Sequence, residues 1–380
     1  MTPRALRIAI FTDTYPPQIN GVARTLARAV DALRSRGHDV RVVTTDDPGA
    51  GDEPGVHRFA GRPFYAYPQL RIALPSARRV LDAFGPWRPD LVHLATPFGV
   101  GLAGRRVARR LGVACVSSYH TSLATYAQFY GLGAISGLSW RFLRWFHNST
   151  KLTLAPTHAI ANELRAHQFV NVGVWGRGVD TTEYHPSWRS DALRTSWGAR
   201  GDSVVITYVG RLAKEKGLDV VLSAMRAVAA ERNDVIYVVA GSGPYELECR
   251  KLAPDGTIFT GHVAGKQLSE TYASSDLFVF ASVTDTLGNV VQEAMASGLV
   301  VVAADVPQTR EVLAEGGVLF APGDSEALAG ALRMIIDSPS SRARLAESAE
   351  AAARSRSWTA IFDQLETSYL GAAAMALTSS

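Results

Sequence analysis

Short apolar stretches alternate with segments of helical periodicity along the first half of the chain. The stretches that we predict as strands are Leu6–Phe11, Val40–Thr44, Leu91–Leu94, Val113–Ser118 and Leu152–Ala155. After the first of them, Gly21 leads into a helical pattern over residues 22–36, which Gly37 ends. Strands that alternate with helices in this way predict a parallel sheet with helices on both faces.

The same alternation starts again in the second half. The predicted strands there are Val204–Val209, Val235–Ala240, Ile258–Thr260, Leu277–Phe280, Val300–Ala303 and Val318–Phe320. The polar stretch from Tyr184 to Asp202 separates the two series and is the expected linker. We therefore predict an α/β chain with two doubly wound domains. Because ligands of such sheets bind at the carboxyl ends of the strands, functional residues should follow strands in both halves and face one another across a cleft.

The composition agrees with two folded domains. The chain has 380 residues, of which 47% are hydrophobic, and this excludes a disordered or fibrous protein. No stretch approaches the ~18 uncharged apolar residues of a membrane-spanning helix, and the apolar start of the chain is typical of a strand rather than a signal peptide. Cys115 and Cys249 lie far apart without metal-ligand spacing, so we expect a reducing, cytoplasmic environment and neither a zinc site nor a disulfide scaffold.

Charge is distributed unevenly along the chain. Residues 1–185 contain 22 Lys and Arg against 12 Asp and Glu, whereas the remaining residues contain 17 against 23, and residues 101–150 contain no acid. A basic half beside an acidic half suggests an anionic partner, such as nucleic acid, anionic lipid or a charged substrate. A chance fluctuation of surface charge is the alternative.

Two glycine-rich turns look like nucleotide-binding loops but lack parts of them. The segment Gly99–Gly104 has the spacing G-x-G-x-x-G, yet no acid that could bind a ribose occurs before Glu163. We interpret it as a glycine-rich helix start and not as a NAD or FAD site. The segment Ala240–Pro244 lacks the third glycine and the lysine of a P-loop, so close packing of strand against loop is the better interpretation.

The loop Gly210–Gly217 follows a predicted strand and carries two cations of interest, Arg211 and Lys216. The fork of an arginine together with the point charge of a lysine suits a pyrophosphate. In a dry cleft, such cations stabilise a departing nucleoside diphosphate. A solvated charged turn is the alternative.

The segment Asp285–Ala294 also follows a predicted strand. Gly288 and Asn289 begin a helix, so the free amides of its first turn form a site for an anion or a sugar hydroxyl. Asp285 precedes this helix and Glu293 lies inside it, and a carboxylate accepts hydrogen bonds from the vicinal diol of a ribose or hexose. The alternative is an N-cap acid and a solvent-facing glutamate, although the neighbours of Glu293 are typical of a core.

The first half contributes two further candidates. Asn20-Gly21 follows the first strand and offers a backbone that a ligand can approach closely. His120 follows the strand that starts at Val113 and could donate to a sugar hydroxyl or to a leaving phosphate. A single histidine of this kind is more often structural.

In this order, the segments resemble glycosyltransferase family 4, whose GT-B architecture has two Rossmann-like, doubly wound domains facing across a cleft. The resemblance covers essentially the whole chain and rests on TDTYPPQINGVARTL, SYHTS, GRLAKEKG, AGSGP and TDTLGNVVQEAMASG. The stretch Val174–Asp180 is similar to the branch of GDP-mannose-dependent α-mannosyltransferases and sulfoquinovosyl-diacylglycerol synthases. The resemblance implies an acceptor-binding domain over 1–185, against which the last helix, about 357–380, is expected to pack. It implies a nucleotide-sugar-binding domain over 186–356.

The resemblance also implies roles for individual residues. Gly21 would approach the donor phosphates, and His120 would contact the transferred sugar near the reaction centre. Arg211 and Lys216 would bind the diphosphate, and Glu293 the nucleotide ribose. The donor-binding candidates that would act largely through their backbone groups are His262, Val263, Leu287, Gly288, Asn289 and Val290.

Two more sets follow from the same resemblance. Asp285 occupies the first position of the family's E-x7-E pattern with a side chain one methylene shorter, and it completes a candidate catalytic set. That set is His120, Asp285, Arg211 and Lys216. On the loop after the first strand, the candidates for the acceptor site are Asp13, Tyr15 and Gln18.

The implied reaction is transfer from a nucleoside-diphosphate sugar with retention of configuration, without a metal or another cofactor. The acceptor hydroxyl would attack the face from which the diphosphate leaves, and the leaving phosphate oxygen would serve as the base. GDP-mannose is the expected donor and a lipid or glycolipid the expected acceptor. UDP-sulfoquinovose, UDP-glucose and UDP-glucuronate are alternative donors, and diacylglycerol or a small molecule an alternative acceptor. A nucleotide-sugar epimerase and a catalytically silent nucleotide-sugar-binding protein are competing interpretations of the whole chain.

Two segments of the first half suggest membrane contact. Arginines 105, 106, 109 and 110 share one face of a predicted helix, and the segment Leu138–Phe146 mixes aromatic residues with arginines. Basic and aromatic helix surfaces are typical of interfacial membrane contact, so we expect peripheral binding to an anionic surface, such as the inner face of the plasma membrane. Ordinary core packing of the aromatics is the alternative. We do not expect nucleic acid binding, because no recognised module is present.

Overall fold

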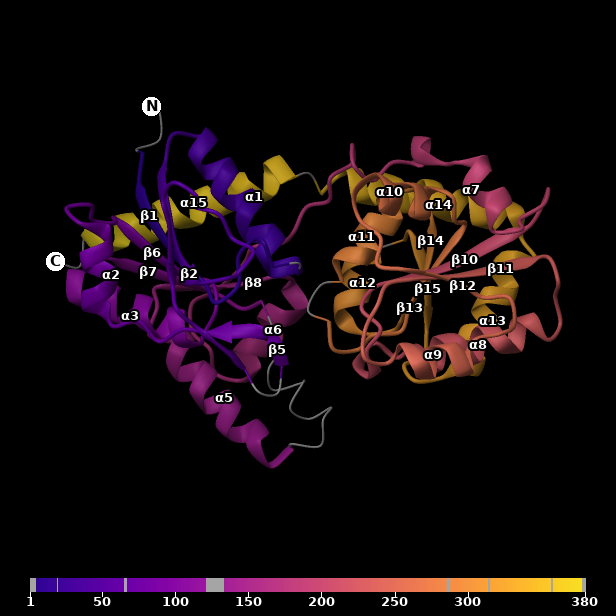
Figure 1. Cartoon of the computed structure of the whole chain (residues 1–380), viewed down its shortest axis with the longest axis horizontal. Coiled ribbons are helices and arrows are strands. Elements are labelled where there is room, and N and C mark those ends of the chain that lie inside the picture. The colour runs from indigo at the N-terminus through magenta and orange to yellow at the C-terminus, as the bar shows by residue number, and fades with distance from the viewer. Residues whose placement is uncertain are drawn as a thin grey trace. The chain divides into compact units, whose positions relative to one another are not determined.

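The computed structural model describes residues 5–18, 20–64, 67–120, 133–285, 288–313, 315–356 and 358–377. The chain divides into two compact units (Figure 1). Unit 1 contains residues 1–176 together with 359–380, and unit 2 contains residues 177–358. Each unit is built around its own parallel sheet with helices packed on it, as the alternating pattern predicted.

Within the described residues, unit 1 contains a seven-stranded sheet in the order β3-β2-β1-β6-β7-β8-β9. Its strands are β1 (Arg7–Phe11), β2 (Asp39–Thr45), β3 (Val56–Phe59), β6 (Leu91–Leu94), β7 (Ala114–Ser118), β8 (Leu152–Ala155) and β9 (Val172–Val174), and they pair in parallel. The five predicted strands are confirmed. The pattern missed β3 and β9, which lie at the edges of the sheet. Most of their residues are only partly buried, so they lack the continuous apolar run of an inner strand.

The described part of unit 2 contains a six-stranded parallel sheet in the order β12-β11-β10-β13-β14-β15. Its strands are β10 (Val204–Val209), β11 (Val235–Ala240), β12 (Ile258–Gly261), β13 (Leu277–Phe280), β14 (Val300–Ala304) and β15 (Gly317–Phe320), and each of them was predicted. In both sheets the strand order reverses beside the first strand. This is the arrangement of a Rossmann-like, doubly wound fold, with its switch point between β1 and β6 in unit 1 and between β10 and β13 in unit 2.

Helices cover the sheets, and β4 (Arg62–Phe64) pairs antiparallel with β5 (Tyr67–Ile72) outside them. The helices of unit 1 are α1 (Gly21–Ser35), α2 (Ala77–Phe84), α3 (Gly99–Leu111), α5 (Gly133–His147), α6 (His158–Ala166) and, from Thr359 onward, α15 (Trp358–Leu377). Those of unit 2 are η1 (Pro186–Trp188), α7 (Asp191–Ser196), η2 (Lys214–Lys216), α8 (Leu218–Ala229), α9 (Glu246–Leu252), α10 (Gly265–Ala273), α11 (Asn289–Ala296), α12 (Pro307–Leu313), α13 (Ser325–Ile336) and α14 (Pro339–Arg354). Among the described residues, none of these helices is both long and apolar enough to cross a bilayer.

The boundary between the units lies after Gly176, whereas the sequence placed it at 185. The Arg177 guanidinium already donates to Asn289 of unit 2, with 3.2 Å between Nη1 and Oδ1. Val179 belongs to a core cluster of the same unit. The chain therefore joins the second core soon after β9 ends.

The polar stretch 184–202, expected as a linker, packs within unit 2. It contains the short helices η1 and α7. Its Arg194 is buried and donates to the carboxylate of Asp276 at 2.9 Å. A polar segment is folded here because its charge has a partner in the sheet region, which the local sequence does not reveal.

The last helix, α15, is attached to unit 1 by polar contacts along its length. His38 Nε2 lies 3.1 Å from Glu366 Oε1, and the Tyr369 hydroxyl lies 2.7 Å from His93 Nδ1 in the buried interior. In Figure 1 this yellow helix lies among the indigo and magenta elements of unit 1. The C-terminal segment is therefore a structural part of the unit that begins the chain.

Close packing of α3 requires the glycines at its start. A Cβ added at Gly99 would lie 2.0 Å from the Ala73 carbonyl oxygen, and one at Gly101 would lie 1.8 Å from that of Thr96. A real Cβ cannot come so near a backbone carbonyl, so the glycines let the helix approach its neighbours. These contacts support the interpretation of the segment as a glycine-rich helix start.

The glycine turn after β11 has the same explanation. A Cβ at Gly241 would lie 1.9 Å from the Gly210 carbonyl oxygen, and one at Gly243 would lie 2.2 Å from that of Leu212. The interpretation of this turn as close packing is confirmed. The contact fixes the loop that starts at Gly210 against its neighbour.

Candidate active site

In unit 2, two predicted residues meet at the carboxyl edge of the sheet. Lys216 lies on the turn η2, which follows β10, and Asp285 lies on the loop that follows the neighbouring strand β13. The Lys216 ammonium donates to both carboxylate oxygens of Asp285, with N–O distances of 2.7 and 2.9 Å. Both side chains are largely buried. The switch point between β10 and β13 therefore brings together a cation and an acid that are 69 residues apart in the sequence.

Arg211 lies on the same loop and pairs with a residue that the sequence analysis missed. Its guanidinium donates to the carboxylate of Glu215, whose side chain is fully buried, whereas the side chain of Arg211 itself is 37% exposed. A buried carboxylate needs such a partner, because desolvation disfavours an isolated charge. Glu215 thus orients Arg211 while part of the guanidinium stays accessible. Glu215 sits in a run of charged residues, which looks like a solvated turn until the structure is known.

The nearby carboxylates also affect a tyrosine of β10. Burial, together with the charges of Asp285 and Glu215, raises the pKa of Tyr208 well above its usual range. Tyr208 therefore stays protonated, and its hydroxyl donates to the Arg211 carbonyl oxygen at 3.0 Å. This hydrogen bond holds the start of the cationic loop against the end of the strand.

The helix α11 begins just after Asp285 in the sequence. Gly288 precedes it in the left-handed conformation, with a φ of 69°, and a Cβ there would lie 3.1 Å from the Phe280 ring. Glycine is therefore favoured at this position. Asn289 is the first residue of the helix and Val290 the second. The candidate Leu287 falls outside the described residues.

Glu293 lies in α11 and is 7% exposed, so the alternative of a solvent-facing glutamate is wrong. Its Oε2 accepts a hydrogen bond at 3.1 Å from the hydroxyl of Tyr272, a fully buried residue of α10. Tyr272 orients the carboxylate and was not predicted, because a tyrosine in an amphipathic helix is usually part of the core. His262 and Val263 follow the end of β12, where Val263 is buried and His262 is exposed.

In unit 1, the candidates on the loop after β1 are less accessible than expected. Asp13 is completely buried, where its carboxylate accepts hydrogen bonds from Thr96 Oγ1 at 2.6 Å and from the Val100 amide at 3.0 Å. It thereby satisfies the amino end of α3. Tyr15 is also buried, which raises its pKa to about 12. Gln18 is partly exposed and accepts from a neighbouring threonine hydroxyl at 2.7 Å.

The other candidates of unit 1 lie at the carboxyl edge of its sheet. Gly21 is the first residue of α1, which the Asn20 side chain caps by accepting from the Ala23 amide at 2.9 Å. His120 lies two residues after the end of β7. Its ring lies edge-on against the Trp175 ring, with 5.7 Å between the ring centroids.

The basic segments of unit 1 form one surface. We call it the α3–α5 surface and define it by Arg105, Arg106, Arg109, Arg110, Leu138, Arg141 and Trp145. The Arg105 guanidinium lies 4.2 Å above the Trp145 ring and joins the two helices. Trp145 is 50% and Leu138 66% exposed, whereas Phe146 is buried in the core. The core alternative therefore applies to Phe146 and not to Trp145.

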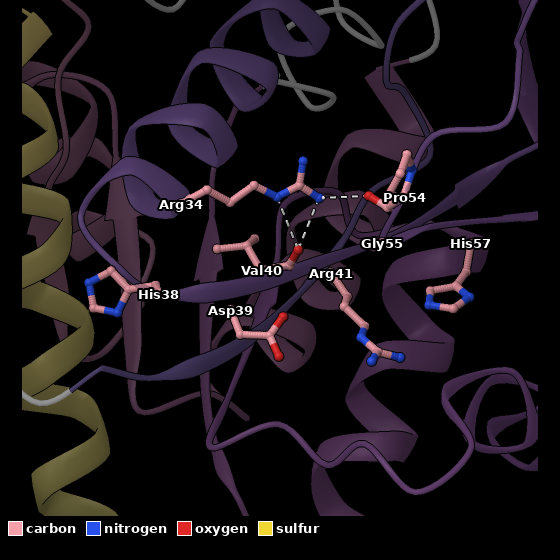
Figure 2. A pocket seen from close by; sticks show the side chains of 8 residues that line it. All are labelled: Arg34, His38, Asp39, Val40, Arg41, Pro54, Gly55 and His57. Carbon is pink, nitrogen blue, oxygen red and sulfur yellow. Dashed lines mark hydrogen bonds between the residues drawn. The ribbon is translucent and has the colours of Figure 1, made fainter.

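A separate pocket of unit 1 lies at the opposite, amino end of the strands (Figure 2). It is lined by Arg34, His38, Asp39, Val40, Arg41, Pro54, Gly55 and His57. The Arg34 guanidinium donates to the carbonyl oxygens of Val40 and Pro54, as Figure 2 shows. Asp39 accepts from the Trp87 indole at 2.6 Å. These contacts join α1 to β2 and to the residues before β3, and none of the predicted site residues lines this pocket.

Family models match both halves of the chain. Residues 19–183 match a family described as "Glycosyltransferase Family 4", and residues 189–352 match "Glycosyl transferases group 1". The first matched segment lies mostly in unit 1, and the second lies within unit 2.

Curated relatives match over most of the chain. A GDP-mannose-dependent alpha-mannosyltransferase of Mycolicibacterium smegmatis is 35% identical, covering 95% of this chain and 96% of the relative. A sulfoquinovosyl transferase of Arabidopsis thaliana is 30% identical over 97% of this chain and 74% of the relative. An alpha-monoglucosyldiacylglycerol synthase of Streptococcus pneumoniae is 28% identical over 86% and 77%.

Among solved structures, sucrose-phosphate synthase from Thermosynechococcus elongatus aligns with a TM-score of 0.77 and 18% identity. The alignment covers 96% of this chain and 98% of that one. At this identity the likeness concerns the fold, and it agrees with the Rossmann-like units.

We expect Asp13→Asn to remove one source of pH dependence in stability. Burial raises the pKa of Asp13 to about 6, so between about pH 4 and pH 6 the folded chain keeps a proton that the unfolded chain has lost. The contribution of Asp13 to stability therefore falls as the pH rises through this window. Asparagine has no proton to lose, so the melting temperature of the natural chain should fall relative to that of the variant from pH 4 to pH 6. A difference that does not change with pH would contradict this assignment.

Proposed function

From the premise that the chain belongs to glycosyltransferase family 4, we propose that it transfers a mannosyl group from GDP-mannose to a lipid or glycolipid acceptor, with retention of the anomeric configuration. The chain is a glycosyltransferase with the fold of that family. The choice of donor, of acceptor and of stereochemical course is the proposal.

The observation that carries the proposal is the charge cluster of unit 2. Lys216 is held by Asp285 at the carboxyl edge of the sheet, and Arg211 is held by Glu215 on the same loop. A diphosphate suits two cations fixed in this way, because it spreads its charge over several oxygens that a lysine and an arginine can contact together. The amino end of α11 adds backbone amides for the same anion.

These groups act on the step in which the sugar leaves the diphosphate. Negative charge builds up on the departing phosphate, and Lys216 and Arg211 stabilise it from positions that the protein sets in advance. A phosphate oxygen takes the proton of the acceptor hydroxyl, which attacks from the same face. Residues of the chain then contribute orientation and charge stabilisation, and not a covalent nucleophile.

The two carboxylates of the family pattern have different partners in this scheme. Both oxygens of Asp285 accept from Lys216. When the diphosphate accepts one of the hydrogen bonds that the Lys216 ammonium donates, one carboxylate oxygen of Asp285 becomes available for a hydroxyl of the sugar. Glu293 binds the ribose diol, and Tyr272 holds its carboxylate in place.

The relatives support GDP-mannose over the other donors. The mannosyltransferase matches with higher identity than the sulfoquinovosyl transferase, 35% against 30%, and over nearly its entire length. UDP-sulfoquinovose, UDP-glucose and UDP-glucuronate are the competing donors, and they differ from GDP-mannose in the base as well as in the sugar.

Two observations support a lipid acceptor at a membrane surface. One relative is named as a synthase of monoglucosyldiacylglycerol, and the α3–α5 surface exposes Leu138 and Trp145 beside its arginines. Exposed apolar and aromatic side chains on a surface that also carries arginines suit the interface of an anionic bilayer. The buried Asp13 and Tyr15 shape the loop beneath the acceptor, and the more exposed Gln18 is the residue of this loop that we place against it.

Lys216→Ala tests the diphosphate assignment. We expect turnover to fall by about 10²–10³-fold, because a charged donor to the developing anion is lost. Lys214→Ala, on the same turn but with an exposed side chain, should keep nearly full activity. Turnover of GDP-mannose is measured by the release of GDP. An unchanged rate in Lys216→Ala would remove the assignment.

A thermal-shift panel tests the identity of the donor. At one hundred times its dissociation constant, a bound donor adds about 2.7 kcal/mol to the free energy of unfolding. GDP-mannose should raise the melting temperature more than the three UDP-sugars do. A larger shift with any UDP-sugar would overturn the proposed donor, and a shift without turnover on any lipid acceptor would favour a silent binding protein.

Co-sedimentation with liposomes at low salt tests the membrane contact. We expect binding to vesicles that contain phosphatidylglycerol and little binding to neutral phosphatidylcholine, because basic residues near an anionic surface contribute about 1 kcal/mol each. The double variant Leu138→Ser/Trp145→Ser should bind less. Leu247→Ser, which changes an exposed leucine of unit 2, is the matched control. Equal binding to both vesicle types would count against this surface.

A further inference from the structure

A row of ring side chains from distant parts of the sequence ends at His120 in unit 1. Trp175 follows β9, His93 lies in β6, and Tyr369 lies in the last helix α15. The Trp175 ring has its centroid 5.7 Å from that of His120 and 6.1 Å from that of His93, with interplanar angles of 65° and 71°. The Tyr369 ring packs in turn against His93, with 5.6 Å between the centroids. Trp175, His93 and Tyr369 were not among the predicted site residues.

Behind Trp175, His93 is fixed through both of its ring nitrogens. Its Nε2 lies 2.6 Å from the hydroxyl of Ser118, and its Nδ1 lies 2.7 Å from the hydroxyl of Tyr369. Burial lowers the pKa of His93 to about 3 and raises the pKa of Tyr369, so both side chains are neutral at ordinary pH. A neutral imidazole has one N–H and one lone pair, which allows it to donate to one hydroxyl and accept from the other. The contacts connect α15 to Ser118, the last residue of β7.

Trp175 is fixed from the other side by the sheet. Its backbone amide donates to the Ala155 carbonyl oxygen, at the end of β8, with a distance of 2.8 Å. Only 2% of the residue is exposed, and among the residues that the structure describes its indole nitrogen has no hydrogen-bond acceptor. A buried N–H without an acceptor is unfavourable. The position therefore uses the bulk and shape of the indole ring, which packs against both His93 and His120.

We propose that Trp175, held in place by His93 and Tyr369, is a positioning residue that sets the orientation of the His120 imidazole. The proposal rests on the proposed function, in which His120 contacts the transferred sugar. A ring packed edge-on against an imidazole restricts its rotation, and a misplacement of about 1 Å at a reacting centre lowers a rate by about 10²-fold. The effect should appear in kcat more than in donor affinity, because the proposed side-chain contacts to the diphosphate and the ribose come from unit 2.

Conservative variants separate this role from stability. Trp175→Phe replaces the indole that contacts His120 with a smaller ring. Tyr369→Phe removes only the hydroxyl that contacts His93. The matched control is Glu366→Gln on the same helix, which weakens the contact of α15 with His38 at the amino end of β2. We expect kcat to fall about tenfold or more in the first two variants, with the KM for the donor changed by less than about twofold. Glu366→Gln should keep kcat even where its melting temperature falls as much.

Histidine NMR gives a second readout that needs no turnover. In protein labelled with ¹³C and ¹⁵N at histidine, the His120 ring signals are assigned by their loss in His120→Gln. They should shift in Trp175→Phe and in Tyr369→Phe, and stay in place in Glu366→Gln. A signal that moves in neither variant, or a loss of kcat in Glu366→Gln equal to that in Tyr369→Phe, would overturn the positioning role. Shifted signals in a chain that transfers no sugar would support the positioning role and contradict the proposed function.

Discussion

The ion pair between Lys216 and Asp285 is the interaction on which the chemistry of unit 2 depends. It forms because the strand order reverses between β10 and β13, so that the loops after these neighbouring strands start side by side. Either charge alone would be costly at its degree of burial, and together they satisfy each other. The pair holds the lysine at the edge of the sheet. A diphosphate that binds there meets an ordered cation, and ordering in advance is what makes such a charge effective in a reaction.

Each of the other side chains that we propose to contact the donor, Arg211 and Glu293, is supported by a second, buried residue. Glu215 is buried under Arg211, and the Tyr272 hydroxyl donates to Glu293. These supporting residues carry no signal in the sequence. A glutamate in a charged turn and a tyrosine in an amphipathic helix have common structural explanations, and only their burial and hydrogen bonds distinguish them.

Unit 1 shows how close packing limits which side chains can reach a ligand. The glycines of α3 allow the helix to touch the backbone at Ala73 and Thr96, and Asp13 is enclosed beside that contact. An aspartate just after the first strand therefore serves the helix terminus, although its position in the sequence is typical of a ligand-binding residue. The exposed chemistry of unit 1 lies instead on the α3–α5 surface, where Trp145 and Leu138 are exposed and Arg105 packs on the Trp145 ring.

The sequence by itself determined the α/β architecture and the inner strands of both sheets, because buried parallel strands need continuous apolar runs and the helices between them need their own period. It also showed that the candidate residues follow strands closely, and ligands of this fold bind at the carboxyl ends of the strands. Only the tertiary structure decided which of them meet. The contact of Lys216 with Asp285 and that of His93 with Tyr369, 276 residues apart, depend on strand order and on how helices pack, and the burial of Asp13 depends on the close approach of α3. Local patterns do not encode these long-range contacts, since each arises from the packing of segments that are remote along the chain.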